Sequence, residues 1–206
     1  VVAAIFCGIL ENPAAAMAAA STVMAAGVLL SFCWLLRGVI RDRTGILAGV
    51  VALLAVTLYF GDTVYETKGW QLLFTMCSYY ACYAITAFLA FGCFLRRKQD
   101  QNPVFAGILI LTCFLSLGTG IQSLRQTVIM TCPMVAVEGL LFLIRLFRKE
   151  KLWDRSMLVT IVIVLANLLG VAASKLISVS SVTIYGGMQI NSLSRMIADV
   201  FPSIYM

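Results

Sequence analysis

The sequence predicts an all-α fold, a polytopic bundle of transmembrane helices, and three observations lead to this fold class. Of the 206 residues, 62% are hydrophobic and only 12% are charged, whereas soluble domains are about half apolar and about a quarter charged. The apolar residues gather into runs of about 20 residues, the length of helix that crosses the hydrocarbon core of a bilayer. Charged residues stand mainly between these runs.

The apolar runs predict six full spans, which follow a partial N-terminal span at residues 1–10. Asn12 and Asn102 each precede a proline, and asparagine as the N-cap with proline at the first helical position marks a helix start. The first and fourth spans are therefore expected to begin at Pro13 and Pro103. The six spans are predicted near residues 13–36, 45–60, 70–95, 103–121, 126–147 and 157–177.

The other spans differ in the strength of their signals. The second, 45–60, is the weakest because a helix of that length barely crosses a bilayer. The third begins at Trp70, an aromatic residue typical of the membrane interface. The fifth contains Pro133, which should loosen the helix because proline has no backbone N–H to donate. The sixth ends near residue 177, where a more polar sequence begins.

Residues 1–178 are expected to form the transmembrane bundle, and residues 179–206 an extracytoplasmic interfacial segment. Gly186-Gly187 predicts a turn. Beyond it, apolar residues recur at helical spacing, which predicts a short amphipathic helix in the outer interface. A simple connector to a further span is an alternative of equal weight. The apolar positions are Ile190, Leu193, Met196, Ile197, Val200 and Phe201.

The basic residues predict the orientation of the bundle. The connections after the first, third and fifth spans hold eleven of the 15 Lys and Arg residues. Cytoplasmic loops carry an excess of Lys and Arg, so these connections are expected to be cytoplasmic and the protein to be multi-pass in a bacterial cytoplasmic membrane. The net charge of +6 is then a topology signal, and no nucleic-acid partner is expected. The residues are Arg37, Arg41, Arg43, Arg96, Arg97, Lys98, Arg145, Arg148, Lys149, Lys151 and Arg155.

Several kinds of site are not expected. The chain has no histidine, and its seven cysteines fall inside apolar runs without CxxC spacing, so the sequence predicts neither a metal centre nor a disulfide framework. No phosphate-binding loop, dinucleotide fingerprint, GxSxG or HExxH motif occurs, and no cofactor is expected. Asp62 and Glu66, in an outer loop, could serve as a base or as metal ligands, but an ordinary solvated loop is favoured.

Three cations are expected on the outer rim. Arg125 stands at the outer end of the fifth span, Lys175 lies at the outer end of the sixth, and Arg195 is on the tail helix. Together they could bind an anionic lipid headgroup or a phosphate-bearing lipid substrate. The alternative is that these side chains only reach up to the headgroups as anchors, without a ligand.

Two polar residues are expected deep in the membrane. Glu138 is nine residues before Phe147 on the fifth span, and Asn167 is ten residues after Met157 on the sixth, so the two should lie at the same depth and approach each other. Carboxylates at such depth are costly and usually face the bundle interior or a wet cavity. Two interpretations stay open, a polar contact that only joins helices and a proton or substrate site.

Part of the chain resembles a known group of proteins. The stretch Gly-Ile-Gln-Ser-Leu-Arg-Gln at 120–126, followed by Pro-Met at 133–134, resembles a late helix of polytopic membrane proteins from Gram-positive bacteria. The stretches 167–172 and 190–193 are similar to the same group. Several of its members look like membrane glycosyltransferases of the GT-C type, and the resemblance covers about the last ninety residues.

The resemblance implies a sugar transfer from a polyprenyl-phosphate donor at the outer face, with Arg125 and Lys175 at the donor phosphate. It also implies an acidic base in a long first external loop, which has no counterpart here. The chain begins with Val-Val-Ala-Ala rather than Met, so we expect a piece of a longer protein with that loop upstream. A transporter or lipid-handling permease with Glu138 and Asn167 along its path is the alternative, as is a non-catalytic membrane assembly subunit.

Overall fold

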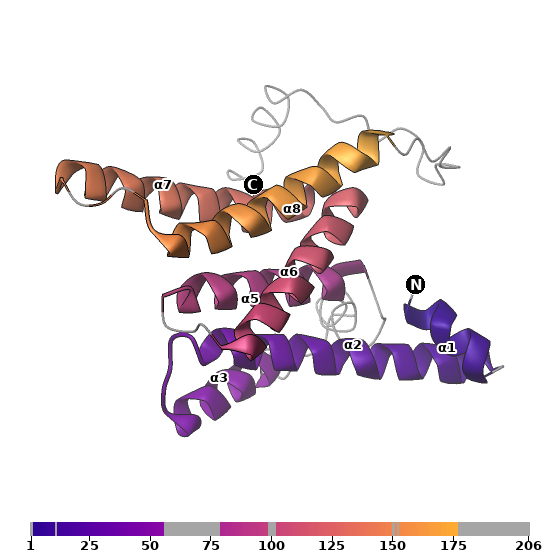
Figure 1. Ribbon diagram of the computed structural model, residues 1–206. Helices are drawn as coiled ribbons and strands as arrows, with labels where there is room; N and C mark the ends of the chain where they lie inside the picture. The colour runs from indigo at the N-terminus through magenta and orange to yellow at the C-terminus, as the bar shows by residue number, and fades with distance from the viewer. Residues whose placement is uncertain are drawn as a thin grey trace, which may run out of the picture. The chain divides into compact units, whose positions relative to one another are not determined.

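The computed structural model describes residues 2–10, 12–55, 79–98, 102–149, 151 and 153–176, and every regular element in these ranges is helical (Figure 1). The described residues belong to one compact unit, and residues 177–206, which form the second, lie outside the described ranges together with the predicted tail helix. The helices are α1 (Val2–Leu10), α2 (Pro13–Leu36), α3 (Arg43–Ala55), α5 (Tyr79–Arg96), α6 (Pro103–Gln122), η2 (Thr127–Thr131), α7 (Cys132–Phe147) and α8 (Arg155–Leu176).

Four of the described helical segments are long and apolar enough to cross a membrane. They are Pro13–Leu36, Pro103–Gln122, Thr127–Phe147 and Ser156–Ser174, and they match the first, fourth, fifth and sixth predicted spans. In each of these segments, between 22% and 39% of an apolar stretch of 18 residues is buried within the protein. The rest is apolar surface that water would solvate poorly and that a bilayer would cover.

The second and third predicted spans are described only in part. Arg43–Leu53 and Ala81–Arg96 are shorter apolar helices. The predicted spans 45–60 and 70–95 extend from them into residues outside the described ranges, as does the outer loop with Asp62 and Glu66.

Both predicted helix starts are confirmed. The side chain of Asn12 accepts hydrogen bonds from the N–H groups of Ala14 (3.0 Å) and Ala15 (3.3 Å). Asn102 accepts one from the N–H of Phe105 at 2.9 Å. Pro13 and Pro103 follow at the first helical position, where a missing N–H has no intrahelical partner to lose.

Helices α6 and α8 make the most extensive contact between elements, and two glycines allow it. A methyl group at Gly120 would overlap the backbone carbonyl oxygen of Asn167, and one at Gly170 would overlap the carbonyl oxygen of Leu117. The backbones therefore touch at these two positions, as small residues permit in membrane helix pairs.

Helix α2 packs mainly against α5, and one aromatic contact joins their C-terminal ends. The guanidinium of Arg96 lies 3.8 Å from the centre of the Trp34 ring and donates a hydrogen bond to the Trp34 carbonyl oxygen at 3.1 Å. Gly92 leaves the space that the Trp34 ring occupies beside α5. Arg96 is thus a buried structural residue, in addition to its predicted topological role.

The fifth predicted span is interrupted by a π-turn. Within η2 the N–H of Cys132 bonds the Thr127 carbonyl, five residues back. This wider turn ends directly before the Cys132-Pro133 step, where proline cannot donate to the ladder. Single π-turns of this kind are frequent at functional sites.

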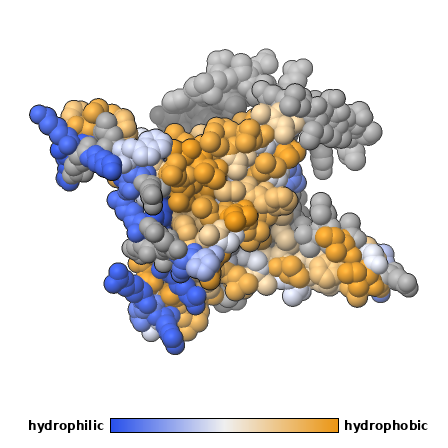
Figure 2. Space-filling model, in the orientation of Figure 1, coloured by the Kyte–Doolittle hydropathy of each residue, from blue (hydrophilic) through white to orange (hydrophobic). Residues whose placement is uncertain are grey.

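The charged residues gather at one end of the described helices. Figure 1 places the C-terminal ends of α2, α5 and α7 and the N-terminal ends of α3 and α8 on one side, and Figure 2 shows the hydrophilic surface on that side beside a broad apolar surface. We call this the basic end. Its exposed cations are Arg37, Arg41, Arg43, Lys98, Arg148, Lys149 and Lys151.

Candidate functional site

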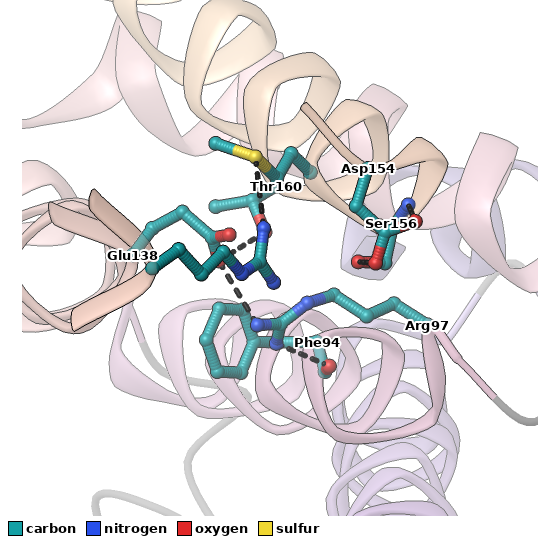
Figure 3. A network of polar contacts seen from close by, with 8 residues as sticks. Phe94, Arg97, Glu138, Asp154, Ser156 and Thr160 are labelled. Carbon is teal, nitrogen blue, oxygen red and sulfur yellow. Dashed lines mark hydrogen bonds and ion pairs between the residues drawn. The ribbon is translucent and has the colours of Figure 1, made fainter. Parts of the chain in front are cut away.

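A buried ion pair lies near the basic end and joins α7 to the end of α5 (Figure 3). The Arg97 Nη2 atom is 3.0 Å from the Glu138 Oε2 atom, and the two side chains are only 7% and 10% exposed. The Thr160 hydroxyl of α8 donates a longer hydrogen bond, 3.4 Å, to the same Oε2. Three helical segments therefore converge on one carboxylate oxygen.

The remaining contacts of Arg97 hold its guanidinium in place. Its Nη1 donates to the Phe94 carbonyl oxygen at 2.8 Å, and the guanidinium carbon lies 3.6 Å from the centre of the Phe94 ring. Arg97 is thus anchored to the last turn of α5 before it reaches Glu138. The other carboxylate oxygen, Oε1 of Glu138, is buried and has no hydrogen-bond partner among the described residues.

Further charged groups surround the ion pair towards the basic end. The half-buried Arg145 donates from Nη1 to the Met157 sulfur at 3.4 Å, and sulfur is only a weak acceptor. The Ser156 hydroxyl donates to Asp154 at 2.7 Å, and the Ser156 N–H donates at 3.4 Å. These bonds hold the pKa of the Asp154 carboxyl below its usual value, helped by the nearby charges of Lys98 and Arg145. Asp154 therefore stays ionised at neutral pH.

Asn167 is the centre of a second buried contact, on the side of Glu138 that faces away from the basic end. Its Oδ1 accepts hydrogen bonds from the hydroxyls of Thr127 at 2.8 Å and Thr131 at 3.0 Å. Its Nδ2 donates to the Ser116 carbonyl oxygen at 3.1 Å. Asn167 is fully buried and so ties α8 to α6 and to the π-turn.

Glu138 and Asn167 do not contact each other, in contrast to the expectation that they would. Among the described residues, the partners of Glu138 are Arg97 and Thr160, and those of Asn167 are Thr127, Thr131 and Ser116. That expectation requires Phe147, at the end of the fifth span, and Met157, at the start of the sixth, to lie at the same depth. Instead the C-terminal end of α7 extends past the start of α8 (Figure 1), so Glu138 lies beside Thr160, seven residues from Asn167.

The three predicted outer cations are only partly described. Arg125 is exposed just before η2, and its backbone N–H donates to the Ser123 hydroxyl at 3.2 Å. The side chain of Lys175 and the whole of Arg195 lie outside the described residues. Their convergence on one anionic ligand stays a prediction.

Sequence reasoning missed the residues that contact Glu138 and Asn167. The sequence pattern presents Arg97 only as one of the loop cations that predict the orientation. Thr160 carried a weak signal, because Ser156, Thr160 and Asn167 are four and seven residues apart on an otherwise apolar helix. Such spacing places polar groups on one helical face.

Metal ligands do not cluster in the part of the chain that the structure describes: no group of three or more His, Cys, Asp or Glu side chains there could hold an ion. Comparisons with protein-family models, with curated proteins and with solved structures return no match. The chemistry of the site therefore rests on its own residues, a buried carboxylate paired with a guanidinium and a separate cluster of hydroxyl and amide groups.

Proposed function

We propose that the chain crosses a bacterial cytoplasmic membrane six times and that its basic end faces the cytoplasm. The alternation of basic connections supports this orientation, as does the gathering of exposed cations at one end of the helices. The four long apolar segments and the two shorter ones, α3 and α5, are the six spans of this topology.

Within that topology we propose a transport function, in which Glu138 is the proton-binding group of a permease that carries protons down their gradient. One observation carries this proposal. Glu138 is a buried carboxylate that binds Arg97 through one oxygen, while its other oxygen lacks a hydrogen-bond partner among the described residues. Ionisable residues within membrane spans are costly and commonly mark proton or substrate paths.

The geometry supplies a simple coupling step. While Glu138 is ionised, its charge holds Arg97 and therefore the end of α5 against α7. When Glu138 takes up a proton, it loses the charge that attracts the Arg97 guanidinium. Arg97 can then interact more strongly with Asp154, whose negative charge already attracts it. Proton binding would thereby release a contact between two helices at the cytoplasmic side.

We expect Glu138→Gln to abolish proton movement while keeping the shape of the side chain. The purified protein is placed in liposomes that hold a trapped pH-sensitive dye, and a potassium gradient with valinomycin imposes a negative interior. Wild type should acidify the interior, and Glu138→Gln should do so at least tenfold more slowly. Asp42→Asn, which removes an exposed carboxylate at the basic end, is the matched control and should behave as wild type.

Two outcomes would count against the transport proposal. Equal proton uptake by wild type and Glu138→Gln would leave Glu138 as a structural partner of Arg97 only. Wild-type protein that moves no protons above empty liposomes would remove the function itself.

A second candidate, a glycosyltransferase that uses a polyprenyl-phosphate-linked sugar, is favoured by the position of Arg125. This arginine is exposed and follows α6, whose C-terminal end lies away from the basic end (Figure 1). The resemblance to GT-C-type proteins assigns to it contact with the donor phosphate. A guanidinium there can form two parallel hydrogen bonds with a phosphate.

We expect Arg125→Ala to weaken binding of a polyprenyl phosphate at least tenfold, as measured by native mass spectrometry from detergent micelles. Arg41→Ala removes an exposed cation from the basic end and should leave the affinity unchanged. The corresponding polyprenol, which lacks the phosphate, should bind both proteins equally weakly. Unaltered phosphate binding by Arg125→Ala would argue that Arg125 is only an interfacial anchor.

A further inference from the structure

The η2–α7 segment and α8 meet through two polar contacts with the same spacing on both sides. Thr131 bonds Asn167, and Glu138 accepts from Thr160. The steps from Thr131 to Glu138 and from Thr160 to Asn167 are both seven residues, or roughly 10.5 Å of helix. The two contacts thus lie at two levels of one antiparallel interface. We call them the Asn167 level and the Glu138 level.

The buried faces of α6 and α8 carry polar residues along much of their length. Burial of hydroxyl and amide groups is unfavourable unless each of them has a hydrogen-bond partner. Apolar side chains would be the ordinary choice on such buried faces. Each of the polar residues is at most 5% exposed. On α8 they are Ser156, Thr160 and Asn167, and on α6 they are Thr112, Ser116 and Thr119.

Three buried oxygen atoms near these residues have no hydrogen-bond partner among the described residues. They are the Ser116 Oγ, the Gln126 Oε1 and the Glu138 Oε1. Ser116 and Gln126 are fully buried, and both are close in sequence to atoms of the Asn167 level. Buried polar atoms of this kind are ordinarily satisfied by water, so we expect a water molecule beside these atoms.

An apolar layer separates the two levels. Met134, 1% exposed, lies between Thr131 and Glu138 on α7, and Ile163, fully buried, lies between Thr160 and Asn167 on α8. Both belong to one hydrophobic cluster with Met130 and Phe105. An apolar constriction excludes water and so interrupts proton movement, and the flexible methionine side chain can change its rotamer to open it.

We infer that the Asn167 and Glu138 levels are two stations of one buried proton path, and that Met134 and Ile163 form the gate between them. This inference rests on the proposed transport function and adds the second station and the gate to it. Protons reach the Asn167 level through hydroxyl groups and water, cross when the gate is wetted, and are taken up by Glu138. In the closed gate the two stations are not connected.

A polar side chain in the apolar layer should hold the gate open. Ile163→Ser and Met134→Ser are expected to raise the proton uptake of liposomes at least tenfold over wild type, and Ile163→Ala should raise it less. The matched controls are Leu165→Ser and Val135→Ser, the same type of change on outward positions of the same helices, which are 51% and 50% exposed. Both controls should show the wild-type rate.

The leak must also depend on Glu138. Adding Glu138→Gln to Ile163→Ser should return the rate to that of Glu138→Gln alone. The folding of each variant is checked by its far-ultraviolet circular dichroism and by its elution as a single species. If one variant fails to fold, the other substitutions at Ile163 and Met134 still test the gate.

The outcomes separate the gate from the proposed function. If Glu138→Gln stops proton uptake but folded Ile163→Ser and Met134→Ser match their controls, the gate inference is overturned and the transport function stands. If wild type moves no protons but Ile163→Ser leaks through Glu138, the transport function fails while the gated path is supported. A leak that persists in the double variant would overturn the path.

Discussion

Arg97→Ala is expected to destabilise the protein by about 3–5 kcal/mol, because it leaves the Glu138 carboxylate buried without its counter-charge. The pair is well shielded, with side chains 7% and 10% exposed, and its shortest N–O distance is 3.0 Å. The change also removes the hydrogen bond to the Phe94 carbonyl oxygen and the stacking on the Phe94 ring. Unfolding in mixed micelles of a mild detergent and sodium dodecyl sulfate would measure the loss.

The double variant Arg97→Ala/Glu138→Ala distinguishes a buried pair from two independent contacts. Removal of both charges leaves no unpaired ion, so the double variant should be more stable than Arg97→Ala alone. Arg41→Ala, an exposed arginine at the same end, is the control and should change stability by no more than about 0.5 kcal/mol. Additive losses in the double variant would mean that the two side chains do not interact.

Gly170→Ala should be the other strongly destabilising change, by about 1–3 kcal/mol. The added methyl group would meet the Leu117 carbonyl oxygen and, at 3.0 Å, the backbone nitrogen of Ile121. Backbone atoms cannot rotate away as a side chain can, so α6 and α8 must separate. The hydrogen bond from Asn167 to the Ser116 carbonyl oxygen, 3.1 Å long, would lengthen with them.

The same substitution at two other helical glycines should not be destabilising. Gly107 on α6 and Gly139 on α7 have no atom within 4 Å of an added Cβ. Alanine has a higher helix propensity than glycine by about 1 kcal/mol, so Gly107→Ala and Gly139→Ala should be neutral or slightly stabilising. The measurement is again unfolding in mixed micelles. If Gly170→Ala stabilised the protein as much as Gly107→Ala, the close approach of α6 and α8 would be wrong.

The sequence was sufficient for the helices whose ends carry local signals. Asn12-Pro13 and Asn102-Pro103 act through the backbone of their own first turn, so the starts of α2 and α6 could be predicted to the residue. The apolar composition of the long spans was equally clear, because burial in lipid requires little more than length and hydrophobicity.

The partners of Glu138 depended on features that local patterns do not contain. The level of α7 against α8 depends on how far the end of α7 extends past the start of α8. An error of seven residues in that level predicted Asn167 in place of Thr160 as the neighbour of Glu138. Arg97 follows the last turn of α5 and belongs by sequence to a basic connection, but its long side chain returns along Phe94 to reach α7. Only tertiary packing decides which of several loop arginines turns inward.

The π-turn in η2 has a consequence for the direction in which polar side chains before and after it point. On a regular α-helix each residue advances by about 100°, so Gln126 and Glu138, twelve positions apart, would diverge by about 120°. Both are nevertheless buried. The π-turn between them accommodates one extra residue, so the twelve positions rotate the chain as about eleven would. The angle between the two side chains then falls to about 20°. A helical wheel drawn through this segment as a uniform α-helix would turn one of the two towards the acyl chains.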